Sequence, residues 1–517
     1  MNSKHKKQAI SLSTTKVKPD NLSAENLFQV AVSYHQQERF LEASNLYDYV
    51  LSVNTTHADA WHMRGLLEAG RGENIQAVKF ISQAISLNPT KSAYFNNRGL
   101  SLQAQQCLSE ALDDFQKAIA LEPSLAQAHS NLGNLYVELQ RCEEALLCFN
   151  RAIELQANYA DAYFNRANLY VTMRNVVAAI KDYDQALAIV PDDEEIKFNK
   201  AHALLLNGEY EKAWPLFESR LAHSAVKKDY PQFDMPQWLG GEIIQGKTVL
   251  IYAEQGLGDN LQFIRYVPML ASLGAKVIVQ VPQPLLSLFE NMQGISELIK
   301  NGDTRPAFDF HCPMMSLPLA FNTNLDSIPS CPQFFIPQPK VEYWRNKSDR
   351  KEKLLVGLVW ASGVHPSKPT MSKDYERRNL PLKLLKAFAG VEVDFFSLQK
   401  GEPAETEFKK AVALDWDGPE ILNFVDELKD FADTAALVMN LDLVISVDTA
   451  TAHLSASLGK PVWLLTRYDA CWRWGLDRED CPWYPSLKIY RQPSLGDWET
   501  VIQRVRQDLL AWCVDQH

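Results

Sequence analysis

Residues 247–282, KTVLIYAEQGLGDNLQFIRYVPMLASLGAKVIVQVP, decide the fold class of the second half of this chain. An apolar run at Val249–Ala253 leads into a glycine-containing turn, an amphipathic stretch follows, and a second run rich in β-branched residues occupies Lys276–Val281. Buried strands joined by a helix are typical of a parallel sheet. The stretch therefore predicts a β-α-β unit that opens a parallel sheet.

A second series of predicted strands follows further along the chain. It consists of KLLVGLVWASG (353–363), VEVDFFSLQKG (391–401), LDLVISVDTATAHL (441–454) and PVWLLT (461–466). Strands that alternate with helical stretches indicate a doubly wound sheet. A proline-rich stretch at 325–350 separates the two series and is typical of a linker. We therefore expect two Rossmann-like domains that face a cleft, with ligands bound at the carboxyl ends of the strands.

The chain before this region repeats with a period of 34 residues. Alanine recurs without insertion or deletion, an aromatic or branched residue follows it by four positions, and a small residue precedes it by twelve. The alanines are Ala43, Ala77, Ala111, Ala145, Ala179 and Ala213, and the small residues are Ala31, Gly65, Gly99, Gly133, Ala167 and Ala201. This pattern resembles the tetratricopeptide repeat, in which small residues let two helices approach and a ring fills the gap between them. We expect six units over 24–227, coiled into an α-solenoid.

Four asparagines occupy the same position in successive repeats: Asn97, Asn131, Asn165 and Asn199. An amide both donates and accepts hydrogen bonds, so such a ladder could bind the backbone of an acceptor peptide. It resembles the asparagine ladder of O-GlcNAc transferase, and the whole plan, a solenoid followed by an α/β region, is similar to that enzyme. The alternative is that asparagine is simply common at this position in tetratricopeptide repeats.

Composition limits the class of protein. The chain has 517 residues and a net charge of −11, which argues against a general nucleic-acid binder. No apolar run is long enough to span a membrane. The eight cysteines are scattered and form no CxxC pair, which favours thiols in a reducing cytoplasm over disulfides or zinc. Residues 1–23 are basic and polar without an apolar core, so we expect a disordered leader and a cytoplasmic protein.

Polar side chains follow the predicted strands at three places. The first is EQGLGDN (254–260), where Asp259 is either a helix cap or part of a site. The second comprises the basic stretch around Arg377 and Arg378 and the residues Gln399 and Lys400, and an anionic ligand with two phosphates would explain these cations. The alternative is a solvated surface, which is the simpler interpretation for Arg377 alone and an equal one for Lys400. The third is Asp448, Thr449 and His453, where free N–H groups at a helix start can hold a diphosphate. Taken alone, Asp448 as a cap and His453 as a core residue would be the simpler interpretation.

Two of these stretches together resemble a known enzyme family. EQGLGDNLQFIRYVPML (254–270) and SVDTATAHLSASLGKPVW (446–463) are similar to glycosyltransferase family nine, the heptosyltransferase type. CWRWGLDREDCPWYP (471–485) is similar to the branch of that family that carries N-terminal tetratricopeptide repeats. The resemblance covers about 240–500. It implies a GT-B fold and an inverting, metal-independent transfer of a sugar from a nucleotide-diphosphate donor to a protein or glycan acceptor.

The resemblance also implies roles for particular residues. Asp259 would be the general base. Arg378, Gln399, Lys400, Asp448, Thr449 and His453 would bind the donor, and Asn97, Asn131, Asn165 and Asn199 would bind the acceptor. The stretch around 364–380 aligns poorly, so Arg377 and Arg378 both stay candidates for the phosphate ligand. DTATAH departs from the family's DTGLSH-like sequence, which leaves the sugar open.

The sequence predicts no metal and no cofactor beyond the donor. Asp415 and Asp417 in DWD imitate the metal-binding DxD of another glycosyltransferase fold, but two Rossmann-like domains do not need it. The aromatic residues Trp472, Trp474, Trp483 and Tyr484 either stack on a ligand or cover a domain edge. We expect domains at 228–340 and 350–517, the second closed by a helix at about 498–512 that packs back onto the first. The alternative function is a scaffold whose GT-B half is catalytically idle; a nucleotide-sugar epimerase would not explain the solenoid.

Overall fold

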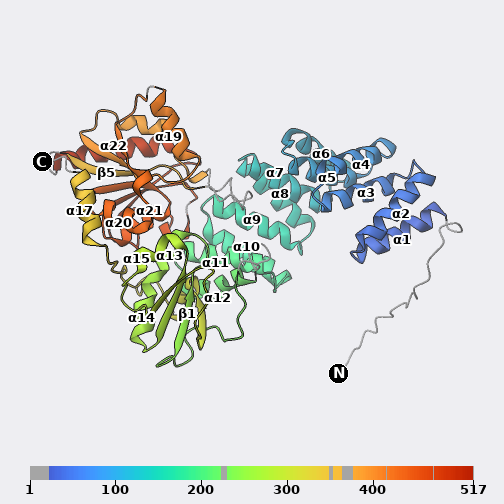
Figure 1. Ribbon diagram of the computed structural model, residues 1–517. Coiled ribbons are helices and arrows are strands. Elements are labelled where there is room, and N and C mark those ends of the chain that lie inside the picture. The colour runs from blue at the N-terminus through green and yellow to red at the C-terminus, as the bar shows by residue number, and fades with distance from the viewer. Residues whose placement is uncertain are drawn as a thin grey trace. The chain divides into compact units, whose positions relative to one another are not determined.

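The structure is a computed structural model that describes residues 23–222, 230–348, 353–363, 377–414, 416–469 and 471–515. The predicted leader lies outside the described residues except for Ser23. The chain divides into two compact units, one up to Leu169 and one from Tyr170 to the C-terminus, and each is treated by itself below. The second unit contains the end of the helical array together with both sheets (Figure 1).

Between residues 23 and 222 the chain forms consecutive α-helices (Figure 1). They are α1 (Ala24–Gln36), α2 (Phe40–Val53), α3 (Ala58–Gly70), α4 (Asn74–Leu87), α5 (Ser92–Ala104), α6 (Leu108–Leu121), α7 (Ala126–Glu138), α8 (Cys142–Leu155), α9 (Ala160–Thr172), α10 (Val176–Ile189), α11 (Glu194–Leu206) and α12 (Tyr210–Phe217). A short 3-10 helix, η2 (Glu218–Leu221), ends the array. The 34-residue period thus corresponds to one pair of helices, as in tetratricopeptide repeats.

The small residues of the repeat lie where the two helices of a pair touch. A Cβ added to Gly99 would lie 2.7 Å from the Phe115 ring, and one added to Gly133 would lie 2.6 Å from the Phe149 ring. The ring predicted to fill the gap therefore does so, and no larger side chain fits at either glycine without moving the ring. The repeating alanines, such as Ala111, are fully buried.

The turn inside each helix pair also repeats. One residue in every pair has a positive φ, and these residues are Glu38, Gly72, Gln106, Gln140, Arg174 and Gly208. Left-handed backbone is unfavourable for residues with a Cβ by about 1 kcal/mol, so the same tight turn is imposed on each repeat by its packing. At Arg174 the side chain of this turn residue contacts the Leu476 carbonyl.

The first sheet has four parallel strands in the order β3-β2-β1-β4. Its elements are β1 (Thr248–Tyr252), α13 (Leu257–Phe263), α14 (Val267–Ser272), β2 (Lys276–Val281), α15 (Leu286–Phe289), β3 (Glu297–Lys300), β4 (Phe310–Pro313) and α16 (Leu317–Ala320). Thr248 pairs with Lys276 at the start of β1 and β2. The predicted β-α-β unit is therefore present, with β1 one residue earlier than expected. Helix α17 (Gln338–Lys347) follows within the proline-rich stretch.

The second sheet has six parallel strands in the order β10-β9-β8-β5-β6-β7. Its elements are β5 (Leu354–Val359), η8 (Leu382–Phe388), β6 (Val393–Ser397), α19 (Ala404–Ala413), β7 (Ile421–Asn423), α20 (Phe431–Val438), β8 (Leu443–Val447), α21 (Ala450–Ser457), β9 (Val462–Thr466), η10 (Trp472–Trp474), β10 (Leu487–Arg491) and α22 (Trp498–Asp515). The predicted fold class, a helical repeat array followed by two parallel α/β sheets, is thereby confirmed.

The last helix packs differently from the expectation. Apolar residues of α22, among them Val501, Val505 and Leu509, belong to the core of the second sheet together with Phe388 and Tyr490. The helix therefore covers its own sheet rather than crossing to the first one. Its apolar positions recur at helical spacing, and the helix contacts η8 and β10 of the second sheet's domain.

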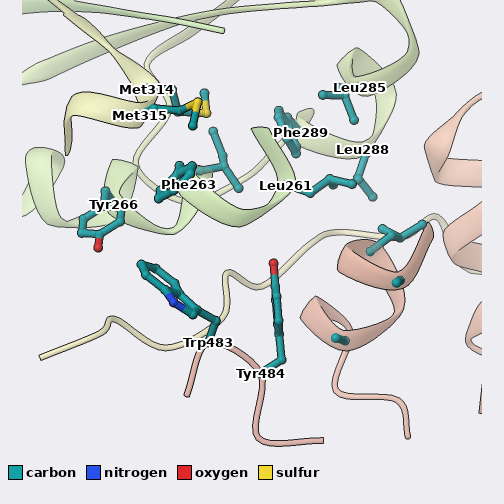
Figure 2. Packing of buried hydrophobic residues seen from close by; sticks show 14 of the residues in the cluster. Leu261, Phe263, Tyr266, Leu285, Leu288, Phe289, Met314, Met315, Trp483 and Tyr484 are labelled. Atoms are coloured by element: carbon teal, nitrogen blue, oxygen red, sulfur yellow. The ribbon is translucent and has the colours of Figure 1, made fainter. Parts of the chain in front are cut away.

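Another segment joins the two sheets instead. Trp483 and Tyr484, which follow η10, pack against Phe263 and other apolar residues of the first sheet's helices (Figure 2). The Trp483 and Phe263 ring centroids are 5.8 Å apart in an edge-to-face arrangement. Residues of both sheets thus share one hydrophobic core. In the part of the chain that the structure describes, no helix is long and apolar enough to cross a membrane.

Candidate functional site

Each parallel sheet has one position where the order of its strands reverses, and ligands in such folds bind at the carboxyl ends of the two strands concerned. In the first sheet this position lies between β1 and β4, and in the second it lies between β5 and β8. The stretches singled out from the sequence, 254–260 and 448–453, directly follow β1 and β8. The topology therefore explains why polar residues collect at these two strand ends.

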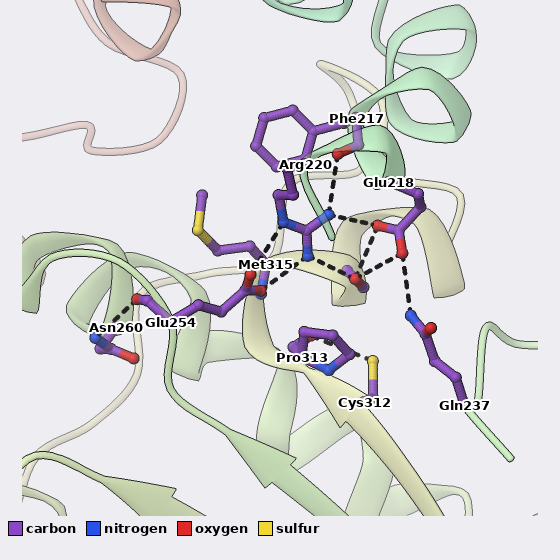
Figure 3. A network of polar contacts seen from close by, with 10 residues as sticks. Phe217, Glu218, Arg220, Gln237, Glu254, Asn260, Cys312, Pro313 and Met315 are labelled. Atoms are coloured by element: carbon purple, nitrogen blue, oxygen red, sulfur yellow. Dashed lines mark hydrogen bonds and ion pairs between the residues drawn. The ribbon is translucent and has the colours of Figure 1, made fainter. Parts of the chain in front are cut away.

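The reversal point of the first sheet is filled by protein side chains (Figure 3). Arg220 from η2 is only 1% exposed, and its Nε and Nη2 donate to the two carboxylate oxygens of Glu254 at 3.0 and 2.8 Å. The Glu254 carboxylate also accepts the Met315 N–H at 2.9 Å. Arg220 further pairs with Glu218 at 2.7 Å. A buried, paired carboxylate of this kind holds the end of the repeat array against β1, so Glu254 is structural here.

The turn after β1 places Asp259 at the start of α13. Gln255 has φ +53°, a left-handed conformation that is uncommon for a residue with a side chain. The Asp259 Oδ2 accepts the Gly256 N–H at 2.9 Å, so this carboxylate caps the first turn of α13. The cap expected from the sequence is therefore present, and it uses only one of the two carboxylate oxygens.

The other carboxylate oxygen of Asp259 pairs with Arg473, an arginine from the domain that contains the second sheet. Arg473 Nη2 lies 2.5 Å from Asp259 Oδ1, and Arg473 Nε donates to Gln262 Oε1 at 2.5 Å. Burial acts to lower the pKa of Arg473, but the nearby Asp259, Cys471 and Asp448 side chains together outweigh it, so the pKa of Arg473 lies above its usual value. Arg473 therefore stays charged in this buried place and fixes the orientation of Asp259.

The first turns of helices α13 and α21 contact each other at a glycine, Gly258. A Cβ on Gly258 would lie 2.7 Å from His453 Cδ2 and 3.5 Å from Ala450 Cα. His453 is buried, and its Nδ1 is 2.8 Å from the Tyr484 hydroxyl. Burial lowers the pKa of His453 to about 4, with Asp448, Arg473 and Asp259 as further nearby charges. The imidazole is therefore neutral at neutral pH, and the two predicted motifs meet around it.

Asp448 and Thr449 lie between β8 and α21, at the reversal point of the second sheet. Burial acts to raise the pKa of Asp448, but several nearby groups, the Arg378 charge first among them, together bring this pKa below its usual value. The distance from Asp448 Oδ1 to His453 Nε2 is 3.9 Å, too long for a hydrogen bond. Thr449 is the N-cap of α21, and its hydroxyl contacts that of Ser446 at 3.0 Å. The first N–H groups of α21 thus follow directly after a carboxylate whose side chain is 15% exposed.

The two candidate arginines before Pro381 have different surroundings. Arg377 Nη2 pairs with Asp469 Oδ2 at 2.6 Å. Arg378 exerts its charge on Asp448, which directly precedes the start of α21. The rest of the basic stretch, including His365 and Lys373, lies outside the described residues.

Gln399 and Lys400 follow β6, but both side chains bind the protein's own backbone. The Gln399 Oε1 accepts the N–H groups of Trp360 and Ala361 at 3.1 and 2.8 Å, and its Nε2 donates to the Ala361 carbonyl at 3.0 Å. Gln399 therefore shapes the chain that leaves β5. Lys400 Nζ donates to the Leu428 carbonyl. Neither contact involves the start of α21.

The aromatic residues near 471–484 join three parts of the second unit. Trp483 donates its Nε1–H to the Tyr210 hydroxyl at 3.1 Å, and Trp472 packs edge-to-face on Trp214 with ring centroids 5.7 Å apart. Tyr210 and Trp214 belong to α12, the last helix of the array. These aromatic rings therefore cover a domain edge, the second of the two interpretations open from the sequence.

The four ladder asparagines form hydrogen bonds within the repeats. Asn97 Nδ2 lies 2.9 Å from His62 Nε2, and Asn131 Nδ2 donates to Asn96 Oδ1 at 2.9 Å. Asn165 Nδ2 contacts Ser130 Oγ at 3.5 Å, and Asn199 Nδ2 donates to the Glu195 carbonyl at 2.9 Å. Three of the amides thus reach the preceding repeat, so stabilising the stack of repeats is one of their functions.

A metal site is not formed by the described residues: no three His, Cys, Asp or Glu side chains among them lie close enough to hold an ion. Of the DWD stretch, Asp417 pairs with Lys386, and Asp415 lies outside the described residues. The residues that sequence reasoning missed are Arg473 and Arg220. Arg473 lies in the stretch 471–485 noted in the sequence, but its partner Asp259 is 214 residues away, and the Glu254 partner of Arg220 is 34 residues away. No local pattern shows these two contacts.

Comparisons with known proteins identify the repeats. The family models "TPR repeat" and "Tetratricopeptide repeat" match residues 104–140, 133–173 and 160–193. The chain therefore carries tetratricopeptide repeats, a class that binds proteins. Protein FlbA of Caulobacter vibrioides is 29% identical over 336 residues, which is 59% of this chain and 53% of that protein. The chain thus spans about half the length of this relative.

Two solved structures are similar to this chain at low identity. Pseudomonas aeruginosa pilF is 18% identical with a TM-score of 0.36, over 41% of this chain and 93% of that one. A tetratricopeptide-repeat protein of Thermus thermophilus, TTC0263, is 20% identical with a TM-score of 0.33, over 35% of this chain and 100% of that one.

Proposed function

We propose that this protein is an inverting, metal-independent glycosyltransferase, which moves a sugar from a nucleotide-diphosphate donor to a protein or glycan acceptor bound by the repeat array. The observation that carries the proposal is the contact between Gly258 and His453. It brings the turn at 256–259 (GLGD), which follows β1 of the first sheet, to the start of α21, which follows β8 of the second. The resemblance of both motifs to glycosyltransferase family nine supports the same function.

The proposed chemistry assigns a task to each side of this contact. Asp259 accepts the proton of an acceptor hydroxyl, whose oxygen forms a bond to the anomeric carbon while the bond to the diphosphate breaks. Negative charge then builds on the leaving diphosphate. The N–H groups at the start of α21 and the Arg378 guanidinium stabilise that charge. Thr449 and His453 border the donor sugar in this scheme.

The ion pair with Arg473 refines the role of Asp259. Asp259 Oδ2 is held by the Gly256 N–H and Oδ1 by Arg473, so an acceptor hydroxyl must share Oδ1 with the guanidinium. A carboxylate fixed from two sides is preorganised for a single direction of approach. In this proposal Arg473 orients the base and does not itself take a proton.

Gln399 and Lys400 contribute less directly than the family resemblance implies. Gln399 would act through the Trp360–Ala361 backbone that it holds, and Lys400 would first have to leave the Leu428 carbonyl. The donor-binding residues favoured by the geometry are therefore Arg378, Asp448, Thr449 and His453.

The test is donor turnover. Purified full-length protein is incubated with a panel of UDP-, ADP-, GDP- and dTDP-sugars, and release of nucleoside diphosphate is measured. We expect Asp259→Asn to lower turnover by about 10²–10⁴-fold, the usual effect of a general base. Asp309→Asn is the matched control. Like Asp259, Asp309 binds a cation, Lys247, and a backbone N–H, that of Thr248, but it does so at the start of β1, at the opposite edge of the sheet. Equal turnover by wild type and Asp259→Asn would remove Asp259 from this role.

A second candidate function is a scaffold with an idle α/β half. The observation that favours it is the Arg220–Glu254 pair, which fills the reversal point of the first sheet with protein. Thermal unfolding in the presence of UDP, ADP, GDP and dTDP separates the two functions. A higher unfolding temperature with one nucleotide supports the enzyme, whereas no shift with any of them and no turnover support the scaffold.

A further inference from the structure

The turn of the fifth repeat differs from its equivalents. Its left-handed residue is Arg174, whereas Gln106 and Gln140 occupy the same position in the two preceding repeats with nearly the same φ, 59–63°. Arg174 is therefore not required by the turn itself, because glutamine forms the same turn. Its side chain is only 20% exposed. The contacts of the Arg174 side chain should therefore explain why this turn carries an arginine.

Arg174 contacts the segment that follows η10. Its Nη2 donates to the Leu476 carbonyl at 2.9 Å and lies 2.5 Å from Asp477 Oδ1. Its guanidinium also lies 5.0 Å from the centre of the Tyr468 ring. Because Tyr468 and Leu476 flank Arg473 along the chain, Arg174 is attached to both sides of the segment that carries Arg473.

A second arginine holds the same segment from the sheet. Arg491, the last residue of β10, donates from Nη2 to the carbonyls of Trp474 and Gly475 at 3.0 and 2.8 Å. Burial, with the nearby Arg174 charge, lowers the pKa of Arg491 to about 10. Three successive carbonyls, from Trp474 to Leu476, are thus bound by two neighbouring guanidinium groups. Charge-assisted hydrogen bonds of this kind fix backbone position.

This segment leads directly into the candidate site. Arg473 binds Asp259 and Gln262, and the Trp474 ring lies 5.2 Å from the His453 ring. A shift of the backbone at 474–476 would therefore move the guanidinium that orients Asp259 and the ring that packs on His453. Arg174 therefore contacts the backbone at 474–476, this backbone continues directly from Arg473, and Arg473 pairs with Asp259.

We propose that Arg174 is a positioning residue that couples the repeat array to the site, by holding the 474–477 segment so that Arg473 orients Asp259. The array then does more than collect an acceptor: its fifth turn sets the geometry of the proposed base. The physical coupling stands without any assumption about activity. Its kinetic consequence rests on the glycosyltransferase function proposed above.

The test compares Arg174→Gln with Gln140→Ala in the full-length protein. Arg174→Gln copies the residue of the neighbouring repeats, so the turn should fold normally. We expect hydrogen exchange of the peptides 471–480 and 256–263 to become about tenfold faster, because the lost Arg174 contacts restrain 474–477 directly and 256–263 through Arg473. Gln140→Ala, which changes the equivalent exposed turn residue, should leave both peptides unchanged. Unchanged exchange in both peptides of Arg174→Gln would overturn the proposal.

Two further variants separate coupling from a general loss of packing. Arg174→Lys keeps a cation beside Asp477 and should restore part of the protection. Asp477→Asn should have little effect, because the Asp477 side chain is 87% exposed. With an active donor, Arg174→Gln should lower kcat about tenfold at an unchanged donor KM, since only the base is misplaced. A raised KM with unchanged kcat would contradict the positioning role. Absence of turnover in wild type would refute the glycosyltransferase and leave the exchange result to decide the coupling.

Discussion

Replacing Arg220 by methionine should strongly destabilise the second unit of the protein. Methionine has a similar length and fits the space of the aliphatic stem, but it leaves Glu254 without its cation. The Glu254 side chain is only 2% exposed, so water cannot take the place of the guanidinium. The carboxylate would keep the Met315 N–H and the Tyr230 hydroxyl as hydrogen-bond partners, but it would lose its cation.

The magnitude follows from the burial of the pair. Removing one member of a fully buried ion pair costs about 3–5 kcal/mol, because the remaining charge stays desolvated. Arg220 additionally loses its contacts to Glu218 and to the Phe217 carbonyl. Glu254→Gln should lower the unfolding free energy by about 2 kcal/mol, less than Arg220→Met, because Arg220 keeps its ion pair with Glu218. The double variant Arg220→Met/Glu254→Gln should cost at least about 2 kcal/mol less than the sum, since neither charge is then left alone.

The assay is urea unfolding followed by tryptophan fluorescence. Only one of the twelve tryptophans, Trp61, lies in residues 1–169, so the signal reports almost entirely on the second unit. Lys247→Met is the control, because the Lys247–Asp309 pair is about half exposed and should contribute at most about 1 kcal/mol. The account of a buried ion pair would be refuted if Arg220→Met lowered the free energy of unfolding by less than about 1 kcal/mol. It would also be refuted if the effects of the two single variants simply added up in the double variant.

Two further predictions concern the contact between α13 and α21. Gly258→Ala should lower the unfolding free energy by about 1–3 kcal/mol, because the new methyl group would lie 2.7 Å from the His453 ring. Gly241→Ala, whose methyl group meets nothing within 4 Å, should not do so, and equal effects in the urea assay would contradict the close contact. His453 has a pKa lowered to about 4, so below pH 6.5 the unfolded chain binds a proton that the folded one does not, and stability falls as the pH drops from 6.5 towards 4. The stability advantage of wild type over His453→Gln should therefore shrink by about 2 kcal/mol between pH 7.5 and 5, and parallel pH curves would contradict it.

Short-range patterns explain which parts of the fold could be predicted. The 34-residue period predicts the helix pairs because each repeat must bury the same small residue against the same ring, as Gly99 does against Phe115. The run Lys276–Val281 predicts β2 to the residue, since a strand buried on both faces has few polar positions. Interactions between neighbours in sequence or in adjacent repeats are sufficient for these elements.

The candidate site was predicted only in part, because the sequence shows residue types but not their partners. Asp259, Asp448 and His453 could be singled out, since each directly follows a strand or starts a helix. Gln399 follows a strand in the same way, yet its amide binds the backbone at Ala361. The packing of α22 on its own sheet could likewise not be read from its apolar periodicity, which shows that a face is buried but not against what.

The sequence by itself therefore determined the repeat array, the two parallel sheets and the strand ends at which polar residues gather. Only the tertiary structure decided which groups Arg220, Arg473 and Arg174 bind. Each of these arginines binds a partner that is distant in the sequence: Glu254 is 34 residues from Arg220, Asp259 is 214 residues from Arg473, and Leu476 is 302 residues from Arg174. Secondary structure follows from local spacing, which a sequence displays directly. Buried ion pairs follow from which surfaces meet, and that depends on the packing of the whole unit.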